Sequence, residues 1–234
     1  MRIAVMQPYF MPYIGYYQMI KAVDKFVFYE DVNFIKQGWI NRNRILLNNK
    51  DFLFTIPLEK ANSFCLIRDT LINEKFYESW KHKFLQSIDQ NYKKAPNFLA
   101  VNDLVQSVLD AKCKTISELA IESILATSRY LGLKTEFFVS SERYQNKDLG
   151  RQERLLDICK KENATHYINA LGGQDLYDKE SFKERGIVLN FIKTLPITYK
   201  QLNDEFIPWL SIIDVLMFNS VDEVHEMLDK FELC

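Results

Sequence analysis

Residues 2–31 read RIAVMQPYFMPYIGYYQMIKAVDKFVFYED, and this stretch decides the fold class. Residues 2–6 form a short apolar run that stops at a Gln-Pro pair, a pattern typical of a buried strand followed by a turn. Residues 13–23 carry apolar side chains at near-helical spacing, and residues 25–29 form a second apolar run. The order strand, helix, strand indicates a βαβ unit. The right-handed crossover of such units predicts that the two strands are parallel neighbours in one sheet.

The rest of the chain extends this pattern around a helical segment. Two further strands are predicted at residues 39–45 and 52–58, joined by a turn at 48–51. Helical periodicity then dominates residues 73–131, where the last helix is capped by Thr115 or Ser117 and ended by Gly132. The later predicted elements are strands at 135–140, 166–170 and 187–193 and helices at 151–163, 178–185, 211–218 and 221–231.

These elements predict a single α/β domain over residues 1–234. Its centre is a Rossmann-like, mostly parallel sheet, and a helical insertion at residues 73–131 lies outside that sheet. A separate helical subdomain over the same residues is the alternative.

Composition excludes several classes of protein. With 47% hydrophobic and 26% charged residues, the chain has the make-up of a globular protein and not of a disordered one. Thirty basic and 31 acidic residues leave a net charge of -1, so no overall charge attracts nucleic acid or a lipid surface. No apolar run approaches the ~20 residues that span a bilayer, and the N-terminal stretch does not read as a signal peptide. The four cysteines form no CxxC, so we expect a reduced, cytoplasmic protein. From the balanced charge and the short apolar runs we expect neither nucleic-acid nor membrane partners.

The first candidate site is the loop after the first predicted strand. Ligands of open parallel sheets bind beyond the carboxyl ends of the strands, which places Gln7 and Asp31 at the mouth of a crevice. Tyr9 lies in the same loop, and Gly15 opens the first turn of the following helix, where free N–H groups can bind an anion. The loop has no histidine, which weighs against nucleotidyl transfer. A proline-stiffened turn without a ligand is the alternative.

The second candidate site is the segment DVNFIKQGWINRNR at residues 31–44, which mixes cations, amides and one indole. In a strand over 39–45, Trp39 and Asn41 share one face and Arg42 points to the other. Guanidinium groups suit phosphate, so we expect Gln7, Tyr9, Asp31, Asn41 and Arg42 to converge on one cleft, with Arg44 facing away. An edge strand with solvated charges is the alternative.

Two later segments carry weaker signals. Gly172 and Gly173 directly follow a predicted strand, which permits positive φ and close approach of a ligand, or a plain tight turn. Ser211 is placed to cap the next helix, with Asp214 completing a capping-box-like pair. His82, His166 and His225 have no metal-ligand spacing, so we expect no metal site, and no cofactor follows from the sequence.

Four of these segments together resemble the WbqC-like protein family. They are QPYFMPYIGY at 7–16, DVNFIKQGWINRNRI at 31–45, YINALGGQDLY at 167–177 and FIPWLSIIDVLMFN at 206–219. The resemblance implies a protein of bacterial O-antigen or other surface-polysaccharide synthesis. It further implies acyl or aminoacyl transfer to a nucleotide-linked amino sugar. It carries over no catalytic residue.

The leading hypothesis is therefore a transferase acting on a nucleotide-linked amino sugar. Here Arg42 and Arg44, or the helix after Gly15, hold the diphosphate, and Tyr9 or Trp39 stacks on the base. Asp31 or His82 removes the proton of the amine. The alternatives are a non-catalytic ligand-binding or scaffold protein of the polysaccharide machinery, and an ATP-dependent, acid-activating enzyme of the nucleotidyltransferase type. An enzyme predicts a pocket with a desolvated carboxylate or histidine, whereas a scaffold predicts an exposed apolar patch without one.

Overall fold

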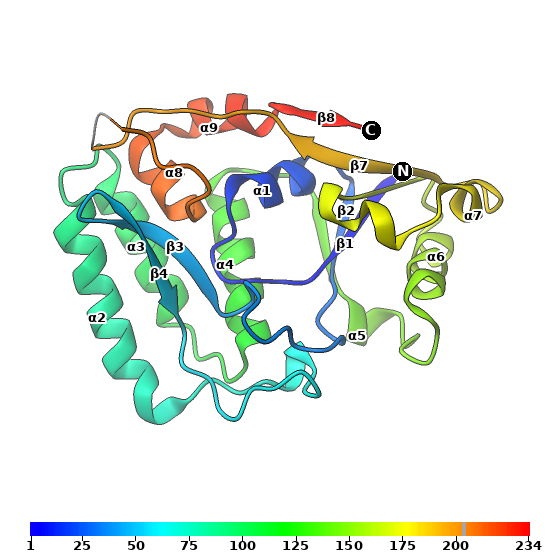
Figure 1. Cartoon of the computed structure of the whole chain (residues 1–234), viewed down its shortest axis with the longest axis horizontal. Coiled ribbons are helices and arrows are strands. Elements are labelled where there is room, and N and C mark those ends of the chain that lie inside the picture. Colours follow the sequence, from blue (N-terminus) through cyan, green and yellow to red (C-terminus); the bar gives the residue numbers. More distant parts are fainter. Residues whose placement is uncertain (203–204) are drawn as a thin grey trace.

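The computed structural model of the chain describes residues 1–202 and 205–234, and Figure 1 shows its arrangement. Within these residues a six-stranded sheet has the order β5-β2-β1-β6-β7-β8. Its strands are β1 (Arg2–Met6), β2 (Lys25–Phe28), β5 (Glu136–Val139), β6 (His166–Ala170), β7 (Val188–Thr194) and β8 (Phe231–Leu233). All neighbouring pairs are parallel except β7 and β8. The predicted α/β class with a mostly parallel sheet is confirmed.

The predicted βαβ unit is present at the N-terminus. Helix α1 (Ile14–Lys21) connects β1 to β2, which pair in parallel from Ile3 with Lys25 to Met6 with Phe28. The strand order reverses at β1, because β2 lies on one side of it and β6 on the other. In open α/β sheets this reversal marks the edge where ligands bind.

The helices lie around the sheet, and some of them form the two ends of the molecule (Figure 1). They are α1, α2 (Glu74–Tyr92), α3 (Phe98–Leu109), α4 (Ile116–Tyr130), α5 (Ser140–Arg143), α6 (Arg151–Lys161), α7 (Lys179–Lys183), α8 (Ile212–Phe218) and α9 (Val221–Leu228), with 3-10 turns η1 (Ile67–Asp69) and η2 (Leu171–Leu176). In Figure 1, α2 and α3 lie at one end and α6 and α7 at the other. One cluster of buried apolar side chains includes Phe26 of β2, Ile88 of α2 and Ile124 of α4, so the helical insertion and the sheet share a core.

Local capping signals place the long helix α4 as predicted. Thr115 accepts a hydrogen bond from the backbone N–H of Glu118, whose carboxylate bonds back to the cap in a capping box. The helix is followed by Gly132 at a φ of 65°, a left-handed conformation that glycine adopts at little cost. No helix in the described residues is long and apolar enough to cross a membrane.

The predicted strands at 39–45 and 52–58 are displaced in the structure. The hairpin consists of β3 (Arg42–Leu47) and β4 (Lys50–Thr55), closed by Asn48 and Asn49 at φ angles of 49° and 64°. Asparagine tolerates this left-handed backbone, which sets a two-residue turn. Trp39 therefore precedes the strand, and its ring lies within 6.0 Å of the Arg42 guanidinium and 5.4 Å of that of Arg44. The predicted separation of Trp39 from both arginines is wrong, because strand alternation starts only at Arg42.

Two expectations for the C-terminal part are also wrong. The last helix ends at Leu228 instead of residue 231, because Phe231–Leu233 pairs with the open edge of β7. Ser211 caps α8 as expected, accepting the N–H of Ile213, but Asp214 completes no capping box. The Asp214 carboxylate is buried and accepts three hydrogen bonds, from Tyr92 Oη (2.8 Å), Tyr199 Oη (2.6 Å) and Gln201 Nε2 (2.8 Å).

Candidate functional site

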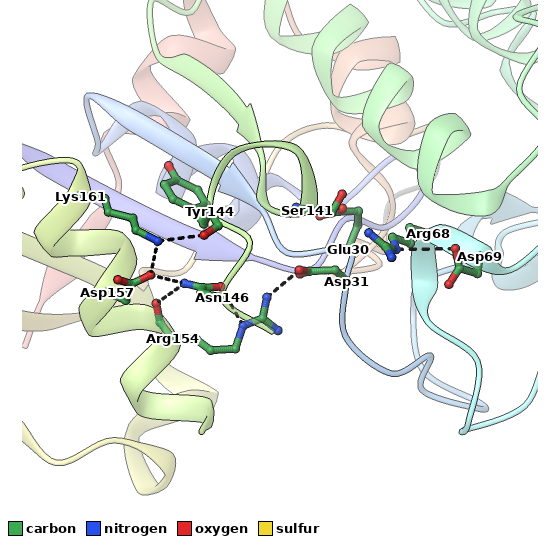
Figure 2. A network of polar contacts seen from close by, with 10 residues as sticks. All are labelled: Glu30, Asp31, Arg68, Asp69, Ser141, Tyr144, Asn146, Arg154, Asp157 and Lys161. Carbon is green, nitrogen blue, oxygen red and sulfur yellow. Dashed lines mark hydrogen bonds and ion pairs between the residues drawn. The ribbon is translucent and has the colours of Figure 1, made fainter. Parts of the chain in front are cut away.

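Two adjacent carboxylates leave the sheet at the carboxyl end of β2. The backbone N–H of Tyr29 still bonds to the Met6 carbonyl of β1, and Glu30 and Asp31 follow it. Figure 2 shows the two side chains pointing in different directions, Glu30 toward Ser141 beyond β5 and Asp31 toward Arg154 of α6. The two carboxylates therefore have different surroundings and different chemistry.

Asp31 forms a buried ion pair. Its Oδ2 lies 2.7 Å from the guanidinium of Arg154, and both side chains are 5% exposed. Arg154 Nε donates to Asn146 Oδ1 at 3.1 Å, and the guanidinium lies 4.5 Å from the centre of the Tyr29 ring. Asp157 accepts a hydrogen bond from Asn146 and pairs with a lysine on the same helix, as Figure 2 shows. This network joins α6 to the end of β2, so Asp31 is placed to hold the fold together.

Glu30 is the carboxylate that faces a cavity. It is 2% exposed, and its Oε1 accepts the backbone N–H of Ser141 at 3.2 Å. Its Oε2 is buried without a hydrogen-bond partner in the described residues. Burial raises the pKa of Glu30, which the hydrogen bond from Ser141 partly opposes. A carboxylate with a raised pKa and one unpaired oxygen is suited to accept and return a proton.

The cavity beside Glu30 has a volume of about 680 Å³. One side is formed by Arg68 of η1, and the other by the segment before α4, which brings Lys112 and Lys114. The backbone N–H of Arg68 donates to the Glu30 carbonyl at 3.0 Å, which fixes the two residues next to each other. The lining therefore includes four carboxylates, of Glu30, Glu118, Glu122 and Glu142, and three cationic side chains.

Several buried polar atoms at this edge have no partner in the described residues. They are Glu30 Oε2, Asp31 Oδ1, Arg68 Nε and Ser140 Oγ, which have no hydrogen-bond partner, although Arg68 Nε lies 3.6 Å from Asp69 Oδ1 in an ion pair (Figure 2). A buried polar atom left unpaired costs about 1–3 kcal/mol, so native proteins pair nearly all of them. Two of the other acids that line the cavity are engaged: Glu118 accepts the N–H of Lys114, and Glu122 pairs with Arg129 at 2.7 Å. Of these four atoms, Glu30 Oε2 and Arg68 Nε belong to residues that line the cavity, as expected of a site for a polar ligand.

Cys113 also lines this cavity but is a poor nucleophile. Burial, together with the charges of Glu118 and Glu122, raises the pKa of its thiol to about 11. The reactive form of cysteine is the thiolate, which is scarce at neutral pH when the pKa is this high. Covalent catalysis through Cys113 is therefore disfavoured.

In the first loop, contacts within the protein engage the backbone of Gln7 and the ring of Tyr9. The Gln7 carbonyl accepts the hydroxyl of Tyr16, whose ring packs edge-on against Tyr9 at 5.1 Å. Burial raises the pKa of Tyr9 well above its usual value. At Gly15, a Cβ would lie 2.4 Å from the ring of Tyr13, so this ring fills the space that we expected an anion to approach. Gln7 and Asp31 do leave adjacent strands at the same edge of the sheet.

One glycine of the pair after β6 leaves room for the side chain of an asparagine. Gly172 and Gly173 lie in η2, and neither uses the positive φ that a glycine permits. A Cβ on Gly173 would lie 2.8 Å from Nδ2 of Asn169, a buried residue of β6. The side-chain amide of Asn169, and not a ligand, makes the close approach that Gly173 permits.

The remaining predicted residues lie outside the Glu30 cavity. Asn41 Nδ2 donates to the Ile56 carbonyl at 2.9 Å, and Arg42 Nε donates to the Gly38 carbonyl at 2.6 Å. Arg42 thus belongs to the hairpin and Trp39 precedes it, and the lining of the cavity includes neither. His82 lies on α2 in a shallow groove against α3, and it is not among the residues that line the cavity either. The structure does not bring these residues to Glu30.

Sequence reasoning missed Glu30, Arg68 and Arg154. Glu30 and Asp31 both follow the strand, so their order along the chain does not say which one faces a cavity. Arg68 lies in an irregular segment without a periodic signal. Arg154 did leave a signal, because it occupies the same helix face as Ile158, where a charge indicates a buried ion pair. In the part of the chain that the structure describes, no group of three or more His, Cys, Asp or Glu is placed to hold a metal ion.

The raised pKa of Glu30 predicts a pH-dependent stability. The folded protein holds the Glu30 proton more tightly than the unfolded chain, so this contribution is present below the ordinary glutamate pKa and lost as pH rises through the raised value. Glu30→Gln keeps an acceptor for the Ser141 N–H and removes the charge. We expect its stability relative to wild type to be more favourable at about pH 8 than at about pH 4. Urea unfolding at both pH values measures the difference in unfolding free energy between Glu30→Gln and wild type. The same difference at both pH values would show that the pKa of Glu30 is ordinary.

Comparison with known proteins places the chain in a family. The model of the WbqC-like protein family matches residues 7–226. The chain is 30% identical over 230 residues to the uncharacterized protein Rv1507c of Mycobacterium tuberculosis (strain ATCC 25618 / H37Rv), with 97% of each chain covered. No solved structure matches the chain. The chain belongs to the WbqC-like protein family.

Proposed function

We propose that this protein is an acyl or aminoacyl transferase that modifies the amine of a nucleotide-linked amino sugar, with Glu30 as general base. The observation that carries the proposal is the buried Glu30 carboxylate, whose Oε2 has no partner in the described residues and whose cavity also holds cations. Surface-polysaccharide synthesis, including O-antigen, is the context implied by the family resemblance. The proposal therefore includes a role in the synthesis of a surface polysaccharide.

Glu30 and the three cationic side chains of the cavity suit a ligand with two ends of opposite charge, beside the three further carboxylates of Glu118, Glu122 and Glu142. An amine, protonated before reaction, pairs with the carboxylate of Glu30. A diphosphate pairs with the guanidinium of Arg68 and with the ammonium groups of Lys112 and Lys114. The volume of about 680 Å³ lies within the roughly 300–1,000 Å³ of small-molecule sites. A nucleotide-linked amino sugar combines these two charges in one molecule.

The proposed step needs an activated acyl donor, such as a thioester. The ammonium group first loses one proton to solvent, and Glu30 Oε2 then takes a second proton from the nitrogen as the nitrogen forms a bond to the acyl carbon. The carbon–sulfur bond breaks, and the departing sulfur receives the proton from Glu30, so the products are an amide and a thiol. A raised pKa favours this shuttle, because it brings the pKa of the base nearer the working pH.

The same observation weighs against a scaffold role. A scaffold needs an apolar docking surface and no titratable group with a shifted pKa. The Glu30 cavity has the opposite character, with charged groups on both sides and a carboxyl whose pKa is raised by burial. This contrast supports an enzyme over a binding module.

The contribution of Arg68 to binding is testable by isothermal titration. Nucleotide-linked sugars are titrated in matched pairs, each with and without a free amine. We expect Arg68→Ala to weaken binding of the amino sugar by about 2–3 kcal/mol, roughly 30- to 150-fold, as for a lost charge-assisted hydrogen bond. Arg42→Ala, which removes a guanidinium bonded to the Gly38 carbonyl, should weaken it far less. A larger loss from Arg42 than from Arg68 would move the phosphate site to the hairpin.

A further inference from the structure

A second cavity, of about 550 Å³, lies between the end of β7 and the start of α8. Its walls come from three segments: Leu195 and Ile197 after β7, Phe206 and Trp209 before α8, and Tyr13 at the start of α1. It shares no residue with the Glu30 cavity. We infer that it binds a small amphiphile, an apolar chain or ring with an anionic head.

Trp209 indicates that this cavity is a built site. Its φ of 63° lies in the left-handed region, which bulky side chains rarely adopt, and its side chain is 67% exposed. The backbone around it is fixed, because Ser211 N–H donates to the Arg44 carbonyl and Ile212 N–H to the Pro12 carbonyl. The strained backbone holds an indole at the cavity with its ring centre 6.0 Å from that of Tyr13. Strain of this kind concentrates at ligand-binding positions.

Buried hydrogen bonds hold the cavity open in one shape. Tyr199 lines it and donates its hydroxyl to Asp214, which is 0% exposed and also accepts bonds from Tyr92 and Gln201. These three donors fix the carboxylate and so fix the Tyr199 ring. A preformed apolar cavity needs little reorganisation when a ligand enters.

One cation sets the polarity of the expected ligand. Lys193 lines the cavity, is exposed, and makes no ion pair among the described residues. The apolar walls accept the body of the ligand, and the ammonium of Lys193 accepts a negative head. The inference is independent of the proposed transferase activity, because the two cavities are separate.

The test is a fluorescence titration with 1-anilinonaphthalene-8-sulfonate, an aromatic anion, on the full chain. Wild type should give saturable binding with one site per chain. Val215→Phe fills the cavity from α8 and should weaken binding about tenfold or more, because the larger side chain takes the space in which the probe contacts the apolar walls. Val188→Phe makes the same change at an exposed position of β7 and should bind as wild type does. Lys193→Gln should weaken binding of the sulfonate but not of the neutral N-phenyl-1-naphthylamine.

A second variant keeps the test decisive if Val215→Phe fails to fold. Thr198→Trp blocks the cavity from an exposed position and leaves the buried face of α8 unchanged. Equal binding by Thr198→Trp and wild type, or binding that does not saturate, would overturn the inference. Loss of nucleotide-sugar binding in Glu30→Gln with unchanged probe binding would separate this site from the proposed active site.

Discussion

Glu30→Gln is expected to lower kcat by about 10²–10⁴-fold, the usual effect of removing a general base. The change keeps the size of the side chain and an acceptor for the Ser141 N–H, so the loss reports the missing proton acceptor. The measurement is the initial rate of amide formation with the amino sugar that binds in titration. Glu136→Gln is the matched control, because Glu136 is exposed and lies at the opposite end of the neighbouring strand β5.

The pH profile gives this prediction a second readout. A base works only when deprotonated, so the rate should rise with pH through the Glu30 pKa, which burial places above the ordinary glutamate value. Glu30→Gln should abolish that rise. Full activity in Glu30→Gln, or an unchanged profile, would contradict the role of Glu30 and return the search for the base to other residues.

Asp31→Ala is expected to destabilise the protein by about 3–5 kcal/mol, because it leaves the guanidinium of Arg154 buried and unpaired. Urea unfolding measures the free energy change. The matched control is Asp51→Ala, which breaks the exposed pair with Arg44 and should cost less than about 1 kcal/mol.

A double variant separates structural from catalytic roles of this pair. Asp31→Asn combined with Arg154→Met removes both charges, and should cost less than the sum of the single changes. If Asp31→Ala instead folds with wild-type stability and loses activity, Asp31 is the catalytic carboxylate that the sequence alone suggested.

Local signals were sufficient for much of the fold. The apolar runs at β1 and β6 predict both strands with their observed bounds, because each is a short run bounded by turn residues. The start of α4 follows from Thr115 and Glu118, which satisfy each other's backbone groups within one turn. These features depend on residues close together in the chain.

Pairing between distant segments decided what local patterns could not. Phe231 continues the apolar pattern of α9, yet it lies in a strand because the edge of β7 offers free backbone groups. The hairpin register was likewise set by the conformation of Asn48 and Asn49 and not by the polarity of residues 39–45. Period and polarity predict that a strand exists more reliably than where it begins.

The candidate site shows the same division. The sequence by itself determined that two carboxylates leave the carboxyl end of β2, because strand, loop and acidic pair are adjacent in the chain. Only the tertiary structure decided that Glu30 faces a cavity and Asp31 an arginine. Ser141 and Arg154, which make that difference, lie 111 and 123 residues further along the chain. The charge state of a carboxyl depends on the burial and partners that such distant residues provide, and these exist only after the chain has folded.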